Sequence, residues 1–317
     1  MTAGAFVLGI VLATAAAAAL AMSMVVQRYA LASGESHVPL FGVPCRANVV
    51  WFLGLVGYGA ANGLYVASLQ YGPLALMASV FTLLLVFNCV FARCLLGEAL
   101  TPPKVAGCVV ILGGVCLVVV GSPKDVDVDL SASDVARLVA KPLGAAYLAC
   151  LVGSVAASVA AIVSYERRYP LGAKDGGAPP PPPRLDRLMG VVYPGSLGLD
   201  EAVAHLSMKA AVSLLGNGNW AAALTWIFSA AWIGASLATL WWLRTVFARY
   251  ETTLALPIEY GSVCVANVLS GLVFYGERRF MSPLQLALVL AGVAVVLVGI
   301  GVGRIEHPPP SRVVQQQ

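Results

Sequence analysis

Long apolar stretches separated by short polar segments dominate this sequence and decide which folds it can adopt. Eight stretches of about 18 residues or more could each cross roughly 30 Å of hydrocarbon as a helix; they are residues 4–26, 48–69, 73–96, 103–121, 143–164, 220–242, 252–275 and 283–303. Only 11% of the residues are charged and the mean hydropathy is +0.86. This leaves too little polar surface to cover a globule in water. We therefore predict an all-α, polytopic membrane helix bundle.

A ninth stretch, residues 189–214, is less apolar because it contains Asp200, Glu201, His205 and Lys209. We include it as a span because the two halves of the chain then share the relation described below. With about nine spans, thirteen Lys and Arg residues fall on the side of the C-terminus and five on the other. Since basic residues favour the cytoplasmic side, we expect a cytoplasmic C-terminus and an extracellular or lumenal N-terminus. Which membrane holds the protein stays open.

Three segments are predicted to lie outside the membrane. Residues 123–142 form a polar, non-cytoplasmic loop, and residues 304–317 form a disordered cytoplasmic tail. Residues 165–188 include five consecutive prolines and form a cytoplasmic linker with extended polyproline character. A docking site for a proline-motif-binding partner at residues 179–183 is the alternative interpretation of that linker.

Several functional classes lack any supporting pattern. No basic stripe with interleaved aromatic residues indicates nucleic-acid binding. The seven cysteines form no CxxC pair, so neither a disulfide framework nor a zinc site is predicted. No nucleophile–base pair is recognisable, and the three histidines, His37, His205 and His307, lie far apart in the sequence. We therefore predict no enzyme activity and no cofactor.

A short pattern occurs twice, at a constant offset of 179 residues. The first copy is Tyr71, Asn88, Gly97 and Glu98, and the second is Tyr250, Asn267, Gly276 and Glu277. Five crossings separate the two matching spans, so the copies should point in opposite directions across the membrane. The pattern predicts an inverted repeat, with a first half at residues 1–122 and a second half at 143–303, an arrangement found in many secondary transporters.

Each copy predicts a tight connection between two helices, which we call the clasp. Gly97 and Gly276 can leave the helical conformation without side-chain strain. Thr101-Pro102 and Ser282-Pro283 are suited to the N-cap and first position of the next helix. Glu98 and Glu277 are expected to face the start of that helix, where a carboxylate can accept backbone N–H bonds. A direct substrate role for these acids is the alternative.

Small residues spaced by four predict close helix contacts. They are Gly59 and Gly63, then Ala230, Gly234 and Ala238, then Gly299 and Gly303.

The stretches GEALTPPKVAGCVVILGGVCLVVVGSP and GERRFMSPLQLALVLAGVAVVLVGIG resemble the closing helix pairs of the EamA-like repeat of the drug/metabolite transporter superfamily. AAN before LQYGP, MKA at 208–210 and TTLALPIEYG at 252–261 are most similar to the NIPA-type magnesium transporters of that superfamily. The resemblance implies a magnesium transporter without a resident cofactor. Two positions depart from the NIPA pattern: Gly59 stands where an acidic residue is usual, and Glu259 stands where Pro-Ile-Tyr-Tyr has its first tyrosine.

Ionisable residues within spans are the main candidates for an ion path, because inserting one costs roughly 2.5–3.5 kcal/mol. Glu259 lies seven residues into its span, just after Pro257, which lacks an N–H and can free a carbonyl. Glu201, His205 and Lys209 repeat every four residues and share one helix face. Further oxygen donors are Tyr260, Asn62, Asn88 and Asn267. For each, a purely structural hydrogen bond or ion pair is the alternative.

The leading hypothesis is a transporter of magnesium or another divalent cation that works by alternating access, with Glu259 and Glu201 as candidate metal ligands. A magnesium path needs oxygen ligands and a few carboxylates. One alternative is transport of a small organic solute, proton-coupled or by exchange. Another is a non-transporting scaffold that displays the proline-rich loop. Expected partners are the lipid bilayer, the transported cation and a second copy in a homodimer.

Overall fold

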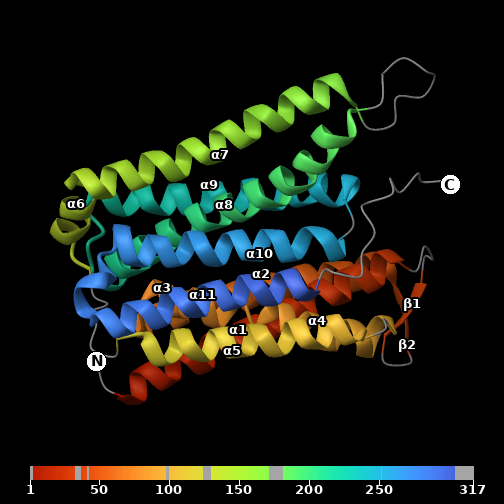
Figure 1. Ribbon diagram of the computed structural model, residues 1–317, viewed down its shortest axis with the longest axis horizontal. Helices are drawn as coiled ribbons and strands as arrows, with labels where there is room; N and C mark the ends of the chain where they lie inside the picture. The colour runs from red at the N-terminus through yellow and green to blue at the C-terminus, as the bar shows by residue number, and fades with distance from the viewer. Residues whose placement is uncertain are drawn as a thin grey trace. The chain divides into compact units, whose positions relative to one another are not determined.

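The structure is a computed structural model that describes residues 3–32, 37–40, 43–97, 100–123, 130–170, 181–250 and 252–303 (Figure 1). The long helices are α1 (Ala3–Ala32), α2 (Ala47–Ser68), α5 (Pro102–Gly121), α7 (Pro142–Arg168), α8 (Pro183–Gly216), α9 (Ala223–Arg249), α10 (Thr252–Leu269) and α11 (Pro283–Gly303). Shorter ones are α3 (Leu74–Phe81), α4 (Leu84–Leu96), α6 (Ala132–Ala140), the 3₁₀ turns η1 (Leu69–Tyr71) and η3 (Glu277–Phe280), and the π-helix η2 (Ser270–Phe274). Glu98, residues 171–180 of the proline-rich linker and the tail (304–317) lie outside the described residues.

The prediction of an all-α polytopic bundle is confirmed. Eight helices in the described ranges are long and apolar enough to cross a membrane, and they match the eight apolar stretches of the sequence. One of them, Leu74–Leu96, is interrupted at Thr82 and Leu83, where it divides into α3 and α4. The ninth stretch also forms a helix, α8, but it is too polar to count among the eight.

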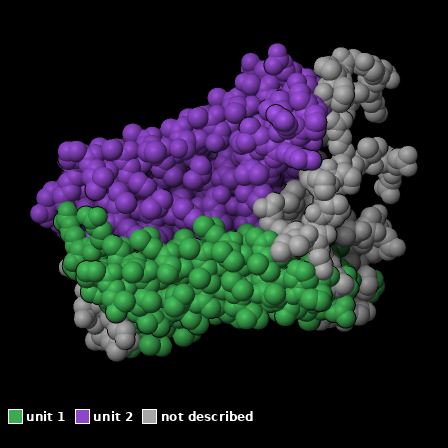
Figure 2. Space-filling view, in the orientation of Figure 1, with its two compact units in different colours: residues 1–128, 277–305 green, residues 129–276, 306–317 purple. Residues whose placement is uncertain are grey.

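The chain divides into two compact units (Figure 2). Unit 1 comprises residues 1–128 and 277–305, and unit 2 comprises residues 129–276 and 306–317. The units therefore do not coincide with the two sequence halves, because α11 belongs to unit 1, where it packs against α5.

Glycines bring α5 and α11 of unit 1 into backbone contact. A Cβ atom on Gly114 would lie 2.7 Å from the carbonyl oxygen of Gly292, and one on Gly107 would lie 2.7 Å from that of Gly299. These glycines are spaced by seven on both helices, so the same helix face is used along the contact. Neither position has room for a larger residue unless the helices separate.

The predicted small-residue contacts are only partly present. Gly299 lies in the α5–α11 contact, but an added Cβ at Gly59, Gly63 or Gly234 would meet nothing within 4 Å in the described chain. Within the described residues, the expectation of tight packing at these three glycines is wrong. Spacing by four shows that small residues share a face; it does not show whether another helix covers that face.

In the second clasp, the Glu277 carboxylate bonds a different helix from the one predicted. Gly97 and Gly276 have φ of 68° and 69°, in the left-handed region that favours glycine. Glu277, which was expected to face the start of α11, bonds the N-terminus of another helix. Its carboxylate accepts the backbone N–H groups of Leu74 at 2.6 Å and Ala75 at 3.2 Å, at the N-terminus of α3. The start of α11 is capped instead by Ser282 and Gln285, each of which accepts the other's backbone N–H.

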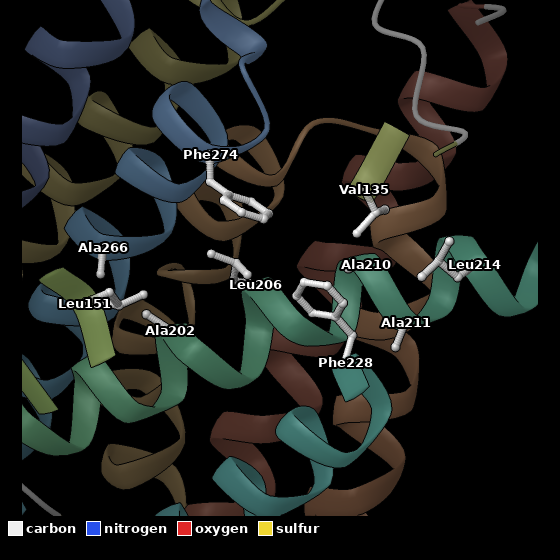
Figure 3. Close-up of a cluster of buried hydrophobic side chains, with 10 residues drawn as sticks. All are labelled: Val135, Leu151, Ala202, Leu206, Ala210, Ala211, Leu214, Phe228, Ala266 and Phe274. Atoms are coloured by element: carbon white, nitrogen blue, oxygen red, sulfur yellow. The ribbon is translucent and has the colours of Figure 1, made fainter. Parts of the chain in front are cut away.

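Unit 2 has an apolar core to which helices α6 to α10 and η2 all contribute (Figure 3). Leu206, Ala210 and Leu214 lie on one face of α8, Phe228 comes from α9, and Phe274 comes from η2. All are at least nine-tenths buried. The core thus fixes one face of α8, the helix that carries most of the ionisable candidates.

Two short elements were not predicted. Strand β1 (His37–Leu40) pairs antiparallel with β2 (Val43–Arg46). The polar loop 123–142 contains α6, which begins with a capping box: Ser131 Oγ accepts the N–H of Asp134, and the Asp134 carboxylate accepts that of Ser131. The Ser131 hydrogen bonds lower the pKa of Asp134. The sequence Ser-Ala-Ser-Asp at residues 131–134 contains the signal for this capping box.

We expect Gly114→Ala to destabilise the protein and Gly113→Ala to leave it as stable or slightly more so. Alanine is about 1 kcal/mol better than glycine within a helix, but at position 114 its Cβ meets the Gly292 backbone, and overpacking costs roughly 1–3 kcal/mol. At Gly113 nothing lies within 4 Å of an added Cβ. Thermal unfolding in detergent micelles measures both. Equal melting temperatures for the two variants would contradict the close α5–α11 contact.

We expect Glu277→Ala to destabilise unit 1 by roughly 1–3 kcal/mol, because it leaves two buried N–H groups of α3 without their acceptor. Hydrogen exchange at Leu74 and Ala75 should accelerate in this variant. Glu277→Gln keeps an acceptor oxygen and should lose less. Arg279→Ala, two residues away and exposed, is the control; an equal effect there would argue against the cap.

Candidate functional site

Helix α8 presents a buried ionisable face within unit 2. Glu201, His205 and Lys209 lie one turn apart along it, and each is at most 5% exposed. Helix α8 is 34 residues long and continues through an internal proline, Pro194. Since a buried charge is costly unless it is paired or solvated, this face requires polar partners from a neighbouring helix.

Helix α10 supplies those partners. A Cβ atom on Gly198 would lie 2.3 Å from the carbonyl oxygen of Glu259, so the backbones of α8 and α10 touch there. Two turns further along α8, His205 Nδ1 lies 2.8 Å from Asn267 Nδ2. The two contacts advance in the same direction along both helices, so α8 and α10 run parallel. We call the residues that meet here, Glu201, His205, Glu259 and Asn267, the polar seam.

The polar seam has more hydrogen-bond acceptors than donors. Glu201 Oε2, Glu259 Oε2 and Asn267 Oδ1 are all buried without a hydrogen-bond partner in the described part of the chain. Glu201 Oε1 lies 3.8 Å from His205 Nε2, too far for a hydrogen bond. Glu201 is also close enough for its charge to repel that of Glu259. The seam therefore favours a ligand that is positively charged or donates hydrogen bonds.

Aromatic residues complete the seam beyond Asn267. Lys209 Nζ lies 4.8 Å from the centre of the Tyr275 ring, and the Tyr275 hydroxyl donates to the Leu206 carbonyl at 2.6 Å. The Tyr147 hydroxyl of α7 lies 2.8 Å from both the Ala266 carbonyl oxygen and the Ser270 hydroxyl. These contacts surround η2, a π-helical turn of the kind often found at functional sites. Lys209 is thus held in a cation–π contact at the other end of the seam from Glu259.

Not every predicted site residue belongs to the polar seam. Tyr260 is buried in α10 and Pro257 lies inside the same helix. Asn62 and Asn88 belong to unit 1, where Asn62 donates to the Tyr58 carbonyl of its own helix at 2.9 Å.

Asp200 accepts a hydrogen bond from Thr239 of α9 at 3.0 Å, away from the seam. Among the described residues, no group of three or more His, Cys, Asp or Glu side chains is placed to hold a metal ion. A metal on the seam would therefore need water in addition to the carboxylates.

No sequence pattern predicted a second polar cluster, which joins α7, α8 and α9. Arg249 donates to both carboxylate oxygens of Glu166, at 2.5 and 2.6 Å, and also to the Tyr169 carbonyl. Tyr193 of α8 donates to the same Glu166 carboxylate. Such bidentate pairs have fixed geometry, so the cluster ties three helices together. Glu166 and Arg249 each lie just beyond an apolar stretch. A charged residue in that position by itself indicates only the membrane surface.

Comparison with known proteins now decides the family. Residues 4–173, more than half of the chain, match the family model described as "Magnesium transporter NIPA". The chain belongs to this family. The resemblance found in the sequence is thereby confirmed, and the protein is an integral multi-pass membrane protein.

Curated NIPA relatives extend the similarity past residue 173. "Probable magnesium transporter NIPA2" of Arabidopsis thaliana is 22% identical over 254 residues, 78% of this chain and 70% of the relative. "Probable magnesium transporter NIPA5" is 22% identical over 79% of this chain and 61% of its own length, and "Probable magnesium transporter NIPA4" is 20% identical over 92% and 81%. Both are also from Arabidopsis thaliana. These names describe transporters and not enzymes. No solved structure matches this NIPA chain.

Proposed function

We propose that the protein transports magnesium or another divalent cation across a membrane, and that the cation binds on the polar seam of unit 2. The observation that carries this proposal is the set of three buried oxygens without partners: Glu201 Oε2, Glu259 Oε2 and Asn267 Oδ1. The family membership and the printed names of the relatives support the substrate class.

The chemistry of the seam suits a hard divalent cation. Two ionised carboxylates balance a charge of +2, and a bound cation offsets the unfavourable repulsion between them when both are ionised. Magnesium takes six oxygen ligands, keeps several of its waters and uses only one or two carboxylates. The two carboxylates and water can fulfil those requirements, and the Asn267 amide oxygen, eight residues or about 12 Å from Glu259 along α10, can accept the ion further along its path.

Transport also requires access from both sides of the membrane. The inverted repeat of the sequence supports alternating access, the mechanism used by many transporters built from such repeats. The distribution of Lys and Arg supports a cytoplasmic C-terminus.

We expect Glu259→Gln and Glu201→Gln each to slow magnesium uptake at least about tenfold, because losing a charged contact costs roughly 1.5–3 kcal/mol and 1.4 kcal/mol is tenfold. Proteoliposomes with an entrapped magnesium-sensitive dye measure the rate. Asp200→Asn is the matched control: the adjacent carboxylate accepts a hydrogen bond from Thr239 of α9, and the amide oxygen of the variant can still accept it, so uptake should fall much less than in the two glutamate variants.

A panel of Mg²⁺, Mn²⁺ and Ca²⁺ identifies the preferred ion. Size-exclusion profiles and melting temperatures show whether the variants fold. Uptake at the wild-type rate by well-folded Glu259→Gln and Glu201→Gln protein would exclude the polar seam as the site. Absence of uptake for every divalent cation tested with wild-type protein would overturn the proposed function itself.

A further inference from the structure

His205 lies in the middle of the polar seam with both ring nitrogens facing seam residues. It is only 3% exposed. Nδ1 lies 2.8 Å from Asn267 Nδ2, and Nε2 lies 3.8 Å from Glu201 Oε1. Imidazole nitrogen is a common metal ligand, so a histidine between the Glu201 carboxylate and the Asn267 amide group bears directly on which ions the seam can bind.

The hydrogen bond to Asn267 decides where the ring proton lies. An amide nitrogen can only donate, so Nδ1 must accept, and the single N–H of the neutral ring is then on Nε2. Turning the amide over would place its oxygen against Nδ1–H and direct the bare lone pair of Nε2 toward the Glu201 carboxylate. Two electron-rich groups facing each other repel, whereas Nε2–H is attracted to the carboxylate. Glu201 therefore favours the tautomer with Nε2–H.

In this tautomer neither ring nitrogen can bind a metal. The lone pair of Nδ1 accepts the Asn267 hydrogen bond, and Nε2 carries a proton. The distance to Glu201 would otherwise permit chelation, because two bonds of about 2.0–2.1 Å from one metal ion can span the 3.8 Å between Nε2 and Oε1. The hydrogen bond, and not the distance, keeps the imidazole from coordinating.

We propose that the Asn267–His205 hydrogen bond is a selectivity device that excludes the imidazole from the cation site, so that the site offers oxygen ligands alone. The need for such a device follows from intrinsic affinities. Imidazole-containing sites bind Co²⁺, Ni²⁺, Cu²⁺ and Zn²⁺ more tightly than Mn²⁺, whereas oxygen-only sites suit Mg²⁺, Ca²⁺ and Mn²⁺. A ring nitrogen whose lone pair faced the ion would thus shift the ion preference of the site toward transition metals. This inference rests on the proposed function and specifies which cations the same site accepts.

The sharpest test is Asn267→Asp, which keeps the side-chain shape and an oxygen but reverses the hydrogen bond. A carboxylate can only accept, so the ring proton moves to Nδ1 and the lone pair of Nε2 turns toward Glu201. Carboxylate–histidine–metal arrangements of this kind are common, and removing such a partner typically changes metal affinity by about 10–100-fold. We expect the ratio of Ni²⁺ to Mg²⁺ uptake in proteoliposomes to rise at least about tenfold in this variant.

Two further variants isolate the imidazole. His205→Asn retains an acceptor oxygen for the Asn267 amide and removes the imidazole, so the ratio of Ni²⁺ to Mg²⁺ uptake should stay at the wild-type value, because the wild-type ring does not bind either ion. The double variant His205→Asn/Asn267→Asp lacks the imidazole and should lose the gain in Ni²⁺ uptake. The seven cysteines, which also bind soft metals, are present in every variant, so their contribution cancels in the comparison.

A second measurement does not depend on transport. The chain has only three histidines, so His37→Gln and His307→Gln leave His205 as the single histidine for ¹⁵N NMR in micelles. Wild-type Asn267 should give a protonated Nε2 and an unprotonated Nδ1, and Asn267→Asp should give the reverse.

The outcomes separate the two proposals. The inference is overturned if His205 shows the Nδ1–H tautomer in the presence of Asn267. It is also overturned if well-folded Asn267→Asp protein transports Mg²⁺ without gaining Ni²⁺ uptake. The proposed function fails separately, if the Glu201→Gln and Glu259→Gln variants leave the uptake of every cation unchanged. A melting temperature for Asn267→Asp checks that the variant is folded. If it is unfolded, the ¹⁵N NMR measurement of the His205 tautomer with Asn267 in place tests the inference.

Discussion

The need to bury the ionisable face of α8 inside protein governs the structure of unit 2. Water is absent from the hydrocarbon region of a bilayer, so Glu201, His205 and Lys209 must find polar partners or face a cavity. Gly198 lets α10 approach until the backbones touch, and this brings Glu259 and Asn267 beside that face. Apolar residues on the adjacent face of α8 pack into the core of Figure 3 and fix the rotation of the helix. The site follows from one helix with two different faces.

Family membership and site location come from different parts of the chain. The family model covers residues 4–173, whereas the polar seam lies between Glu201 and Asn267. Alignments with the curated relatives reach beyond residue 173, since the longest covers 92% of the chain. The seam can therefore be compared residue by residue among NIPA proteins. Glu259 matters most in such a comparison, because the sequence resemblance predicts a tyrosine at this position.

Hydropathy was enough to predict the helices but not their partners. Apolar length located the eight spans because each helix satisfies its own backbone hydrogen bonds and needs no distant residue to form. The left-handed Gly97 and Gly276 were predictable for the same reason, since the conformation is local. The Glu277 bonds to Leu74 and Ala75 were not, because they join residues more than 200 positions apart. A carboxylate suited to any helix N-terminus does not reveal which one it will bind.

The same limit applies to the site. Spacing by four placed Glu201, His205 and Lys209 on one face, and span position singled out Glu259 and Asn267. Joining them required the parallel register of α8 and α10, which no local pattern contains. The role of His205 was the hardest to predict from the sequence, because the direction of its hydrogen bond depends on an amide 62 positions away. Glu166 and Arg249 were overlooked because an ion pair at span ends looks like ordinary surface charge.

The cap on α3 also has a consequence for biosynthesis. Leu74 and Ala75 leave the ribosome about 200 residues before Glu277, and at 5–20 residues per second that interval is on the order of 10–40 s. Throughout that time the nascent α3 lacks its carboxylate, and α5 lacks α11. Unit 1 can therefore close only after residues 277–303 have been synthesised, so its first four apolar segments must remain competent for assembly, in the translocon or in the surrounding lipid, until α11 arrives.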